Sequence, residues 1–94
     1  MSYRFEWDER KASQNRIRHR VTFDEALSVF DDPLAKIFED DPHSGEERRE
    51  IIVGHSIKGR LLLVCFIERP NERIRLVSAR LPTATERKAY EENI

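Results

Sequence analysis

The feature that most constrains the fold is an unbroken apolar run, LLLVCFI, at residues 61–67. A strand in the middle of a buried sheet packs on both faces, so it lacks the polar alternation of a half-solvated strand. Turn-forming residues stand on either side of the run, at Lys58–Gly59 and at Pro70–Glu72. We therefore predict a central strand over Arg60–Arg69, entered and left through tight turns.

Local signals predict the other elements. Capping-box spacings at Thr22–Glu25 and Thr83–Glu86 mark the starts of two helices. Pro33 limits the first of these, because the residue before a proline avoids helical geometry. The full set that we predict is strands at Tyr3–Trp7, Pro33–Glu39, Arg48–Ile57 and Arg73–Ala79, helices at Asp8–Arg18, Thr22–Asp32 and Thr83–Glu92, and a loop at Asp40–Glu46.

We summarise the order as β-α-α-β-β-β-α, one strand fewer than the segments named above, with hairpins in the middle and helices towards the ends. It predicts an α+β fold, in which the helices pack on one face of an antiparallel sheet. With 94 residues the chain is expected to form one domain, 1–94, near the lower size limit for independent folding. Charged residues make up 37% of the sequence, which leaves a thin core and favours stabilisation by a partner chain.

Several classes of protein lack support in the sequence. The single cysteine, Cys65, lies in the apolar run, so we predict a buried thiol in a reducing compartment and no intrachain disulfide. No segment approaches the roughly 18–20 apolar residues of a membrane span, and we expect a soluble, cytoplasmic protein. There is no glycine-rich phosphate loop, no cysteine pair and no HExxH motif, so neither a metal nor another cofactor is predicted.

The net charge of -1 conceals a division of the chain into charged blocks. Residues 10–20 are basic, residues 24–50 are mainly acidic, and residues 58–80 are mainly basic again. If the two basic blocks meet on one face of the fold, they form a phosphate site. If they do not meet, they are an ordinary solvated surface. The charge pattern leaves both alternatives open.

The last strand and the closing helix concentrate groups that suit RNA chemistry. Alternation along the strand predicts two faces, with Ile74, Leu76, Ser78 and Arg80 on one, and Arg75, Val77 and Ala79 on the other. Glu86 and Tyr90 are four residues apart, so they share one face of the helix. Guanidinium groups beside a carboxylate and a phenol suit an RNA phosphate, although ion pairing and ring packing explain the same residues.

His19 is the only histidine inside a basic block. A general acid or base that exchanges a proton near neutral pH would suit RNA cleavage through the ribose 2′-hydroxyl. A histidine at the end of a helix is also a common partner of the helix dipole. The sequence alone does not decide between these two roles.

Five segments, in order along nearly the whole chain, carry a resemblance: FEWDERKASQNRIRHRVTFDEALSVFDDP, ERREIIVG, GRLLLVCFIER, RIRLVSAR and ATERKAYE. Together they resemble the BrnT family of type II toxins. The resemblance implies a small RelE-like fold and a ribonuclease that arrests translation. It also implies a hetero-oligomer with a BrnA-like antitoxin, whose ribbon-helix-helix domain would make the contact with DNA. The chain departs from the usual family pattern at Arg20 and Pro70, where many members have glycine.

The resemblance implies a set of functional positions. The residues expected at the catalytic centre are Arg80, Arg75, Glu68, His19 and Tyr90, and those expected to bind substrate are Lys11, Arg18, Arg60, Ser78, Glu86 and Arg87. In this hypothesis the cleavage of RNA is metal-independent. Arg75 and Arg80 bind the scissile phosphate, Glu68 or His19 transfers the proton, and Lys11 and Arg60 hold flanking phosphates.

Two other functions compete with this hypothesis. The acidic middle of the chain and the thin core also suit a module, or an inactive toxin relative, that binds a partner without catalysis. Direct binding to DNA is disfavoured, because the chain lacks a recognition helix and its net charge is near zero.

Overall fold

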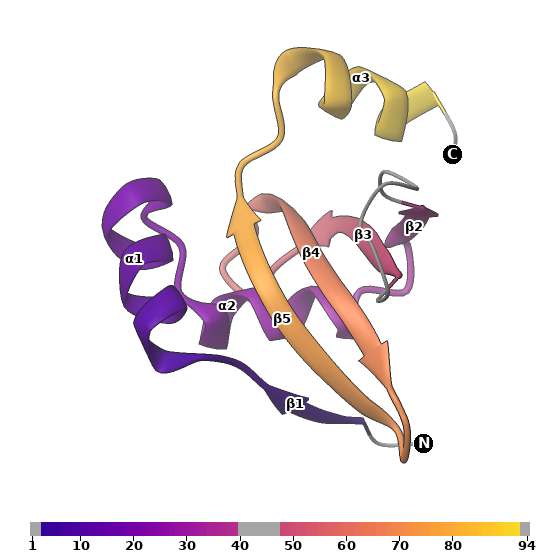
Figure 1. The fold of residues 1–94 in the computed structure, drawn as a ribbon. Coiled ribbons are helices and arrows are strands. Elements are labelled where there is room, and N and C mark those ends of the chain that lie inside the picture. Colours follow the sequence, from indigo (N-terminus) through magenta and orange to yellow (C-terminus); the bar gives the residue numbers. More distant parts are fainter. Residues whose placement is uncertain (1–2, 40–47, 93–94) are drawn as a thin grey trace.

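The structure, a computed structural model, describes residues 3–39 and 48–92. Within them the elements are β1 (Arg4–Glu6), α1 (Glu9–His19), α2 (Phe23–Leu27), the 3-10 helix η1 (Ser28–Asp31), β2 (Lys36–Glu39), β3 (Arg49–His55), β4 (Leu61–Arg69), β5 (Arg73–Arg80) and α3 (Ala84–Glu92). The described strands form one sheet in the order β1-β5-β4-β3-β2 (Figure 1). The α+β class is confirmed. The predicted order β-α-α-β-β-β-α is wrong by one strand, because four described strands, β2 to β5, lie between η1 and α3. The loop predicted at Asp40–Glu46 lies outside the described residues.

The sheet is antiparallel from β2 to β5, as predicted, but β1 pairs in parallel with β5. Phe5 of β1 lies opposite Ile74 of β5. The prediction of a purely antiparallel sheet is therefore wrong for β1. Strands joined by tight turns must run in opposite directions, whereas the first and last strands are joined by most of the chain and have no such constraint.

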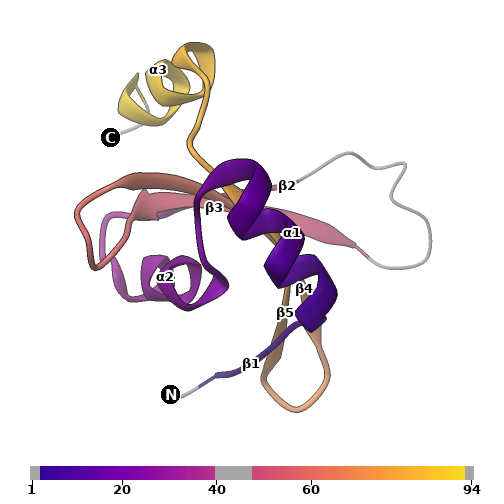
Figure 2. The same cartoon turned by 90° about the vertical axis from the view of Figure 1, so that its left-hand side faces the viewer.

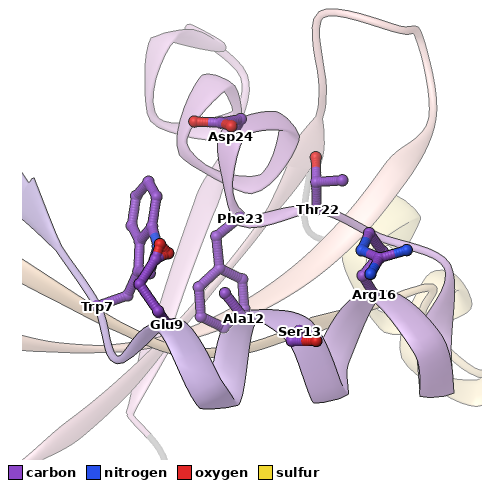
Figure 3. Close-up of a pocket in the computed structure, with 8 residues that line it drawn as sticks. All are labelled: Trp7, Glu9, Ala12, Ser13, Arg16, Thr22, Phe23 and Asp24. Atoms are coloured by element: carbon purple, nitrogen blue, oxygen red, sulfur yellow. The ribbon is translucent and has the colours of Figure 1, made fainter.

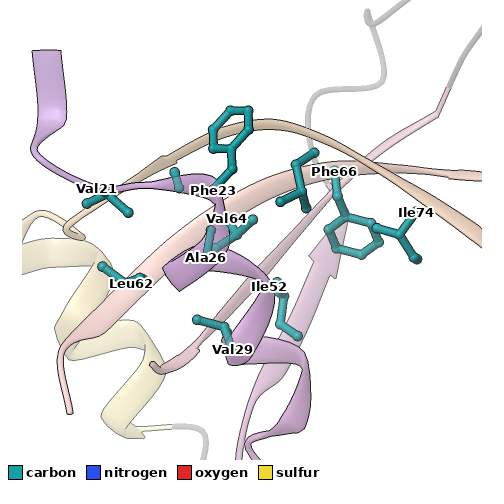
Figure 4. Close-up of a cluster of buried hydrophobic side chains, with 11 residues drawn as sticks. Val21, Phe23, Ala26, Val29, Ile52, Leu62, Val64, Phe66 and Ile74 are labelled. Carbon is teal, nitrogen blue, oxygen red and sulfur yellow. The ribbon is translucent and has the colours of Figure 1, made fainter. Parts of the chain in front are cut away.

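The helices cover both faces of the sheet, so the prediction that they share one face is wrong for α3. On the first side, which we call the α1/α2 face, buried side chains of β4 and β5 pack against α2 (Figure 4). On the other side, the α3 face, Tyr90 packs with Leu61 and Leu63. Figure 2 shows α3 on the opposite side of the sheet from α2. Because successive strand residues point to opposite sides, the apolar run of β4 presents hydrophobic surface to both faces.

A β-bulge interrupts the pairing of β4 with β5. Phe66 lies opposite Leu76, but the adjacent Cys65 lies opposite Ser78, which leaves Val77 as an extra residue in β5. An extra residue shifts the alternation of side chains by one. The predicted faces are therefore wrong beyond Leu76: Ala79 is buried in the core of the α1/α2 face, while Ser78 turns to the α3 face.

Capping residues mark the starts of the helices, although the two predicted capping boxes differ. At α3 the box is complete, because Thr83 Oγ1 accepts from the Glu86 amide at 3.1 Å and Glu86 Oε1 accepts from the Thr83 amide at 2.8 Å. At α2 only the first half forms, since Thr22 Oγ1 accepts from the Glu25 amide at 3.1 Å and the Glu25 side chain turns inwards. No helix in the described part of the chain is both long and apolar enough to cross a membrane.

Both departures from the family pattern fall at turns with positive φ. Arg20 ends α1 in the left-handed region, with φ 58° and ψ 34°, and its amide donates to the Arg16 carbonyl at 2.9 Å. After Pro70, Asn71 and Glu72 have φ values of 64° and 58°. Side chains with a Cβ adopt this region at a cost, so the backbone at Arg20 is strained where glycine would not be.

Candidate functional site

The bulge brings three predicted site residues of β5 to the same face. Arg75, Ser78 and Arg80 lie opposite Ile67, Cys65 and Leu63, in that order. These partners alternate along β4, so they share the α3 face and place the three β5 side chains there as well. Regular alternation would have separated Arg75 from the other two. We call Arg73, Arg75, Ser78 and Arg80 the β5 surface.

Arg73 and Arg75, at the start of β5, form the more basic part of the β5 surface. Three guanidinium groups lie near a single carboxylate, since Glu6 is 3.2 Å from Arg73, 3.4 Å from Arg75 and 3.7 Å from Arg69. The Arg75 side chain stays 35% exposed. Because three guanidinium groups share the Glu6 carboxylate among the described residues, the exposed Arg75 side chain is able to attract a further anion. This cluster therefore suits the phosphate backbone of a nucleic acid.

Arg80, at the upper end of the β5 surface, is held by α3. Its Nη1 and Nη2 donate to the two carboxylate oxygens of Glu86 at 2.7 and 2.9 Å. These hydrogen bonds, together with the one from Thr83, lower the pKa of Glu86 to about 2. Because two hydrogen bonds hold one edge of the guanidinium, its plane is fixed, and the Arg80 side chain remains 35% exposed. Glu86 was predicted to bind substrate, but both of its carboxylate oxygens accept hydrogen bonds from Arg80.

A groove runs along the edge of β5 where α1 replaces a neighbouring strand. β1 pairs only with Arg73–Arg75, and α1 lies beside the second half of β5. The groove has a volume of about 190 Å³, and its walls are Lys11, Gln14, Asn15, Arg18, His19, Val77 and Ser78. It therefore brings together four predicted site residues that are far apart in the sequence, Lys11, Arg18, His19 and Ser78. Ser78 belongs to both the groove and the β5 surface.

Asn15 fixes this groove, and sequence reasoning did not single it out. Its Nδ2 donates to the carbonyls of Val21 at 2.9 Å and Ala79 at 2.8 Å, and its Oδ1 accepts from the Ala79 amide at 3.0 Å. Asn15 is the one buried side chain on α1, within the part of the chain that is described. A polar residue three positions after Ala12, on the side of the helix that meets the sheet, was the available signal.

Two of the predicted site residues lie elsewhere. Glu68 is opposite Ile74, which places it towards the α1/α2 face. Burial of Glu50, together with the charge of Glu68, raises the pKa of Glu50. Tyr90 is buried on the α3 face, where its hydroxyl donates to the Leu34 carbonyl at 3.4 Å. The structure does not bring either residue to the groove.

Arg60 and Arg87 also make contacts of their own. The Arg60 guanidinium binds the buried carboxylate of Glu25, its Nε donating at 3.0 Å, and it also donates to the Arg20 carbonyl at 3.1 Å. The hydrogen bond from Arg60 is the main reason why the pKa of Glu25 is lowered. Arg87 lies 3.9 Å from Glu91 on the exposed side of α3. Among the described residues, no cluster of three His, Cys, Asp or Glu side chains is placed to hold a metal ion.

Comparisons with known proteins identify the family and the fold. Residues 7–86 match the family described as the ribonuclease toxin, BrnT, of type II toxin-antitoxin systems. The fold is similar to the crystal structure of the Brucella abortus ribonuclease toxin, BrnT, with a TM-score of 0.68 and 20% sequence identity. That match covers 87% of this chain and 99% of the Brucella chain. A comparison with curated proteins gave no match.

Proposed function

This chain belongs to the BrnT family of ribonuclease toxins of type II toxin-antitoxin systems, and we propose that it cleaves RNA on the β5 surface and in the adjoining α1–β5 groove. The observation that carries the proposal is the bulge at Val77, which turns Arg75, Ser78 and Arg80 to one face. Ser78 also lines the groove that holds His19. A basic phosphate site thus adjoins a side chain that is able to transfer a proton.

The chemistry that these residues suit is attack by the ribose 2′-hydroxyl on the neighbouring phosphate. His19 takes the proton of the 2′-hydroxyl and returns it to the departing 5′ oxygen. The products are a 2′,3′-cyclic phosphate and a 5′-hydroxyl end. Arg75 and Arg80 stabilise the negative charge that builds up on the phosphate oxygens. We give the proton transfer to His19 rather than Glu68, because Glu68 lies towards the opposite face of the sheet.

The remaining contacts would bind the strand rather than react with it. Lys11 and Arg18 line the groove and hold the phosphates on either side of the cleaved one. Arg60 contributes less than the sequence suggested, since its donors are directed to Glu25 and to Arg20. Tyr90 and Glu86 support the site from α3, and Glu86 does so by orienting Arg80. Arg87 is available to a flanking phosphate at the outer side of α3.

Family membership implies an antitoxin partner, and we propose its type and setting. The partner is a BrnA-like antitoxin that neutralises the toxin in a hetero-oligomer and makes the contact with DNA. The toxin acts in the cytoplasm as one domain, and its cleavage of RNA arrests translation. The reaction proceeds without a metal ion, because the internal 2′-hydroxyl serves as the nucleophile and guanidinium groups stabilise the charge.

The experiment compares purified wild-type protein with Arg75→Ala, His19→Gln and the control Arg48→Ala. Among the described residues, Arg48 forms an ion pair with the exposed Glu39 of β2, at 3.6 Å, and β2 is the strand at the opposite edge of the sheet from β1. We expect Arg75→Ala and His19→Gln to slow RNA cleavage by about 100-fold or more, and Arg48→Ala to leave it unchanged. EDTA should not inhibit the wild type. Wild-type cleavage by a folded Arg75→Ala variant would contradict the site.

Expression of the wild type in a bacterial host separates a toxin from a binding module. Induction of the wild type in a bacterial host should stop growth and protein synthesis, and co-expression of a BrnA-like antitoxin should restore both. If soluble wild-type protein neither slows growth nor cleaves RNA, the chain is a non-catalytic partner-binding module or an inactive relative.

A further inference from the structure

We infer that a second hollow, on the other flank of α1, binds a guanine base of the RNA strand that the groove holds. This inference rests on the proposed function, and it adds a base preference to it. The hollow has a volume of about 280 Å³ and lies between α1 and the start of α2 (Figure 3). The lining residues that bear on the inference are Trp7, Glu9, Ser13, Arg16, Phe23 and Asp24.

One wall of the hollow is an aromatic ring that is held in place. The Trp7 ring packs edge-on with Phe23, with ring centroids 5.7 Å apart and planes at 80°. Its Nε1 donates to Glu9 Oε1 at 3.1 Å. Phe23 itself is 2% exposed and belongs to the core, so the contact anchors Trp7 to the rigid part of the fold. A half-buried aromatic ring in a hollow is a common platform for stacking an unpaired base.

The rim of the hollow is polar and carries both signs of charge. Asp24 is exposed at the start of α2, and Arg16 lies across from it on α1. Guanine is the base whose pairing edge has two adjacent donors, N1–H and N2–H, and both fit the two oxygens of a carboxylate. Adenine, cytosine and uracil each lack this adjacent pair. Asp24 therefore favours guanine, and Arg16 is placed to meet the O6 acceptor or a phosphate.

The position of the hollow connects it with the cleavage site. Lys11 and Arg18 face the groove on one flank of α1, while Ser13 and Arg16 face the hollow on the other. A helix with its side chains is about 10–12 Å across, so one extended RNA strand that crosses α1 reaches both. The two sites would thus read one base and cut a nearby phosphate of the same strand.

The test uses Trp7, which is the only tryptophan of the chain and so reports on this hollow alone. The wild type is titrated with guanosine, adenosine, cytidine and uridine 5′-monophosphates, and tryptophan fluorescence is followed. We expect saturable quenching by the guanosine nucleotide at a concentration about tenfold lower than by any other. Asp24→Asn should remove this preference. Asp31→Asn, an exposed acidic residue on η1, should keep it.

Each outcome decides the inference. Equal quenching by all four nucleotides, or none by any, overturns it. Quenching by a peptide of the antitoxin but by no nucleotide also overturns it, and assigns the hollow to a protein partner. The Arg75→Ala variant separates this inference from the proposed function, because it should bind guanosine monophosphate like the wild type while failing to cleave RNA. If the wild type binds guanosine monophosphate but cleaves no RNA, the guanine site is supported and the proposed ribonuclease activity is rejected.

Discussion

The two faces of the sheet differ in what covers them. Among the described residues, the α1/α2 face has a buried cluster of eleven side chains, whereas the α3 face has one of four, Val53, Leu61, Leu63 and Tyr90. The α3 face also carries the arginines of the β5 surface. The comparison indicates that one face supplies most of the stability, which leaves the other free to hold charge.

The first prediction tests this division with neighbouring residues of β4. Leu62 is 0% exposed on the α1/α2 face, and Leu63 is 6% exposed on the α3 face. Leu62→Ala should lower the free energy of unfolding by about 4 kcal/mol, near the upper end of the range for buried leucines, and Leu63→Ala by about 2 kcal/mol. Urea denaturation followed by circular dichroism measures both. Equal losses would show that the two faces contribute alike.

The second prediction concerns Asn15, which joins the α1/α2 layer to β5. Asn15→Leu leaves the carbonyls of Val21 and Ala79 and the Ala79 amide without their partner. We expect a loss of about 2–3 kcal/mol in the free energy of unfolding, together with slower RNA cleavage. Gln14→Leu, at the exposed neighbouring position, is the control for the free energy of unfolding. An Asn15→Leu protein as stable as the control would mean that the three hydrogen bonds of Asn15 contribute little to stability.

The third prediction strengthens the α1/α2 layer. Arg20 adopts φ 58° at the end of α1, and glycine would do so without strain. Arg20→Gly should therefore raise the free energy of unfolding by up to about 1 kcal/mol, because the Arg20 carbonyl remains available to Arg60. The melting temperature measures the change. An Arg20→Ala variant, which keeps a Cβ, should not gain stability.

The fourth and smallest effect is the pH dependence of the stability that the Arg80–Glu86 pair contributes. Arg80 and Thr83 hold the pKa of Glu86 at about 2, below its usual 4.5. A lowered pKa in the folded state contributes stability above about pH 4.5, and this contribution is lost as the pH falls from 4.5 towards 2. Glu86→Gln removes it at all pH values. The effect should be below about 1 kcal/mol, because the pair is partly exposed.

NMR of the Leu63 methyl groups, which lie in the same cluster as Tyr90, reports this effect. In the wild type, their chemical shifts should change between pH 4.5 and 2. In Glu86→Gln they should differ already at neutral pH and show a smaller change on acidification. A wild-type response that is unchanged by Glu86→Gln would assign the titration to another carboxylate, such as Glu25.

Much of the fold was predictable because its signals are local. The apolar run of β4, the turn at Lys58–Gly59 and the threonine caps each depend on a few neighbouring residues. The side of the sheet on which α3 packs, and the direction of β1, depend on contacts between distant segments. The prediction that all helices share one face overlooked that the apolar run of β4 needs cover on both sides.

The candidate site was predictable in composition but not in arrangement. Lys11, Arg18, His19 and Ser78 were all named from the sequence, and the structure brings them to one groove. Asn15 was missed, because its spacing from Ala12 was the one sign that it faces the sheet, and the charged residues around it indicated an exposed helix. Regular alternation separated Arg75 from Arg80, and only the pairing with β4 shows where the bulge lies.

The bulge at Val77 lets β5 carry one residue more than β4 without moving its arginines to the other face. Deleting Val77 would leave a regular strand in which Arg75, Ser78 and Arg80 keep their partners in β4 and still share the α3 face. The groove beside α1 would instead lose one of its wall residues and the local bend of the strand. Sequence comparisons within the family should therefore treat a gap at this position as a change in the shape of the groove and not as a change of register.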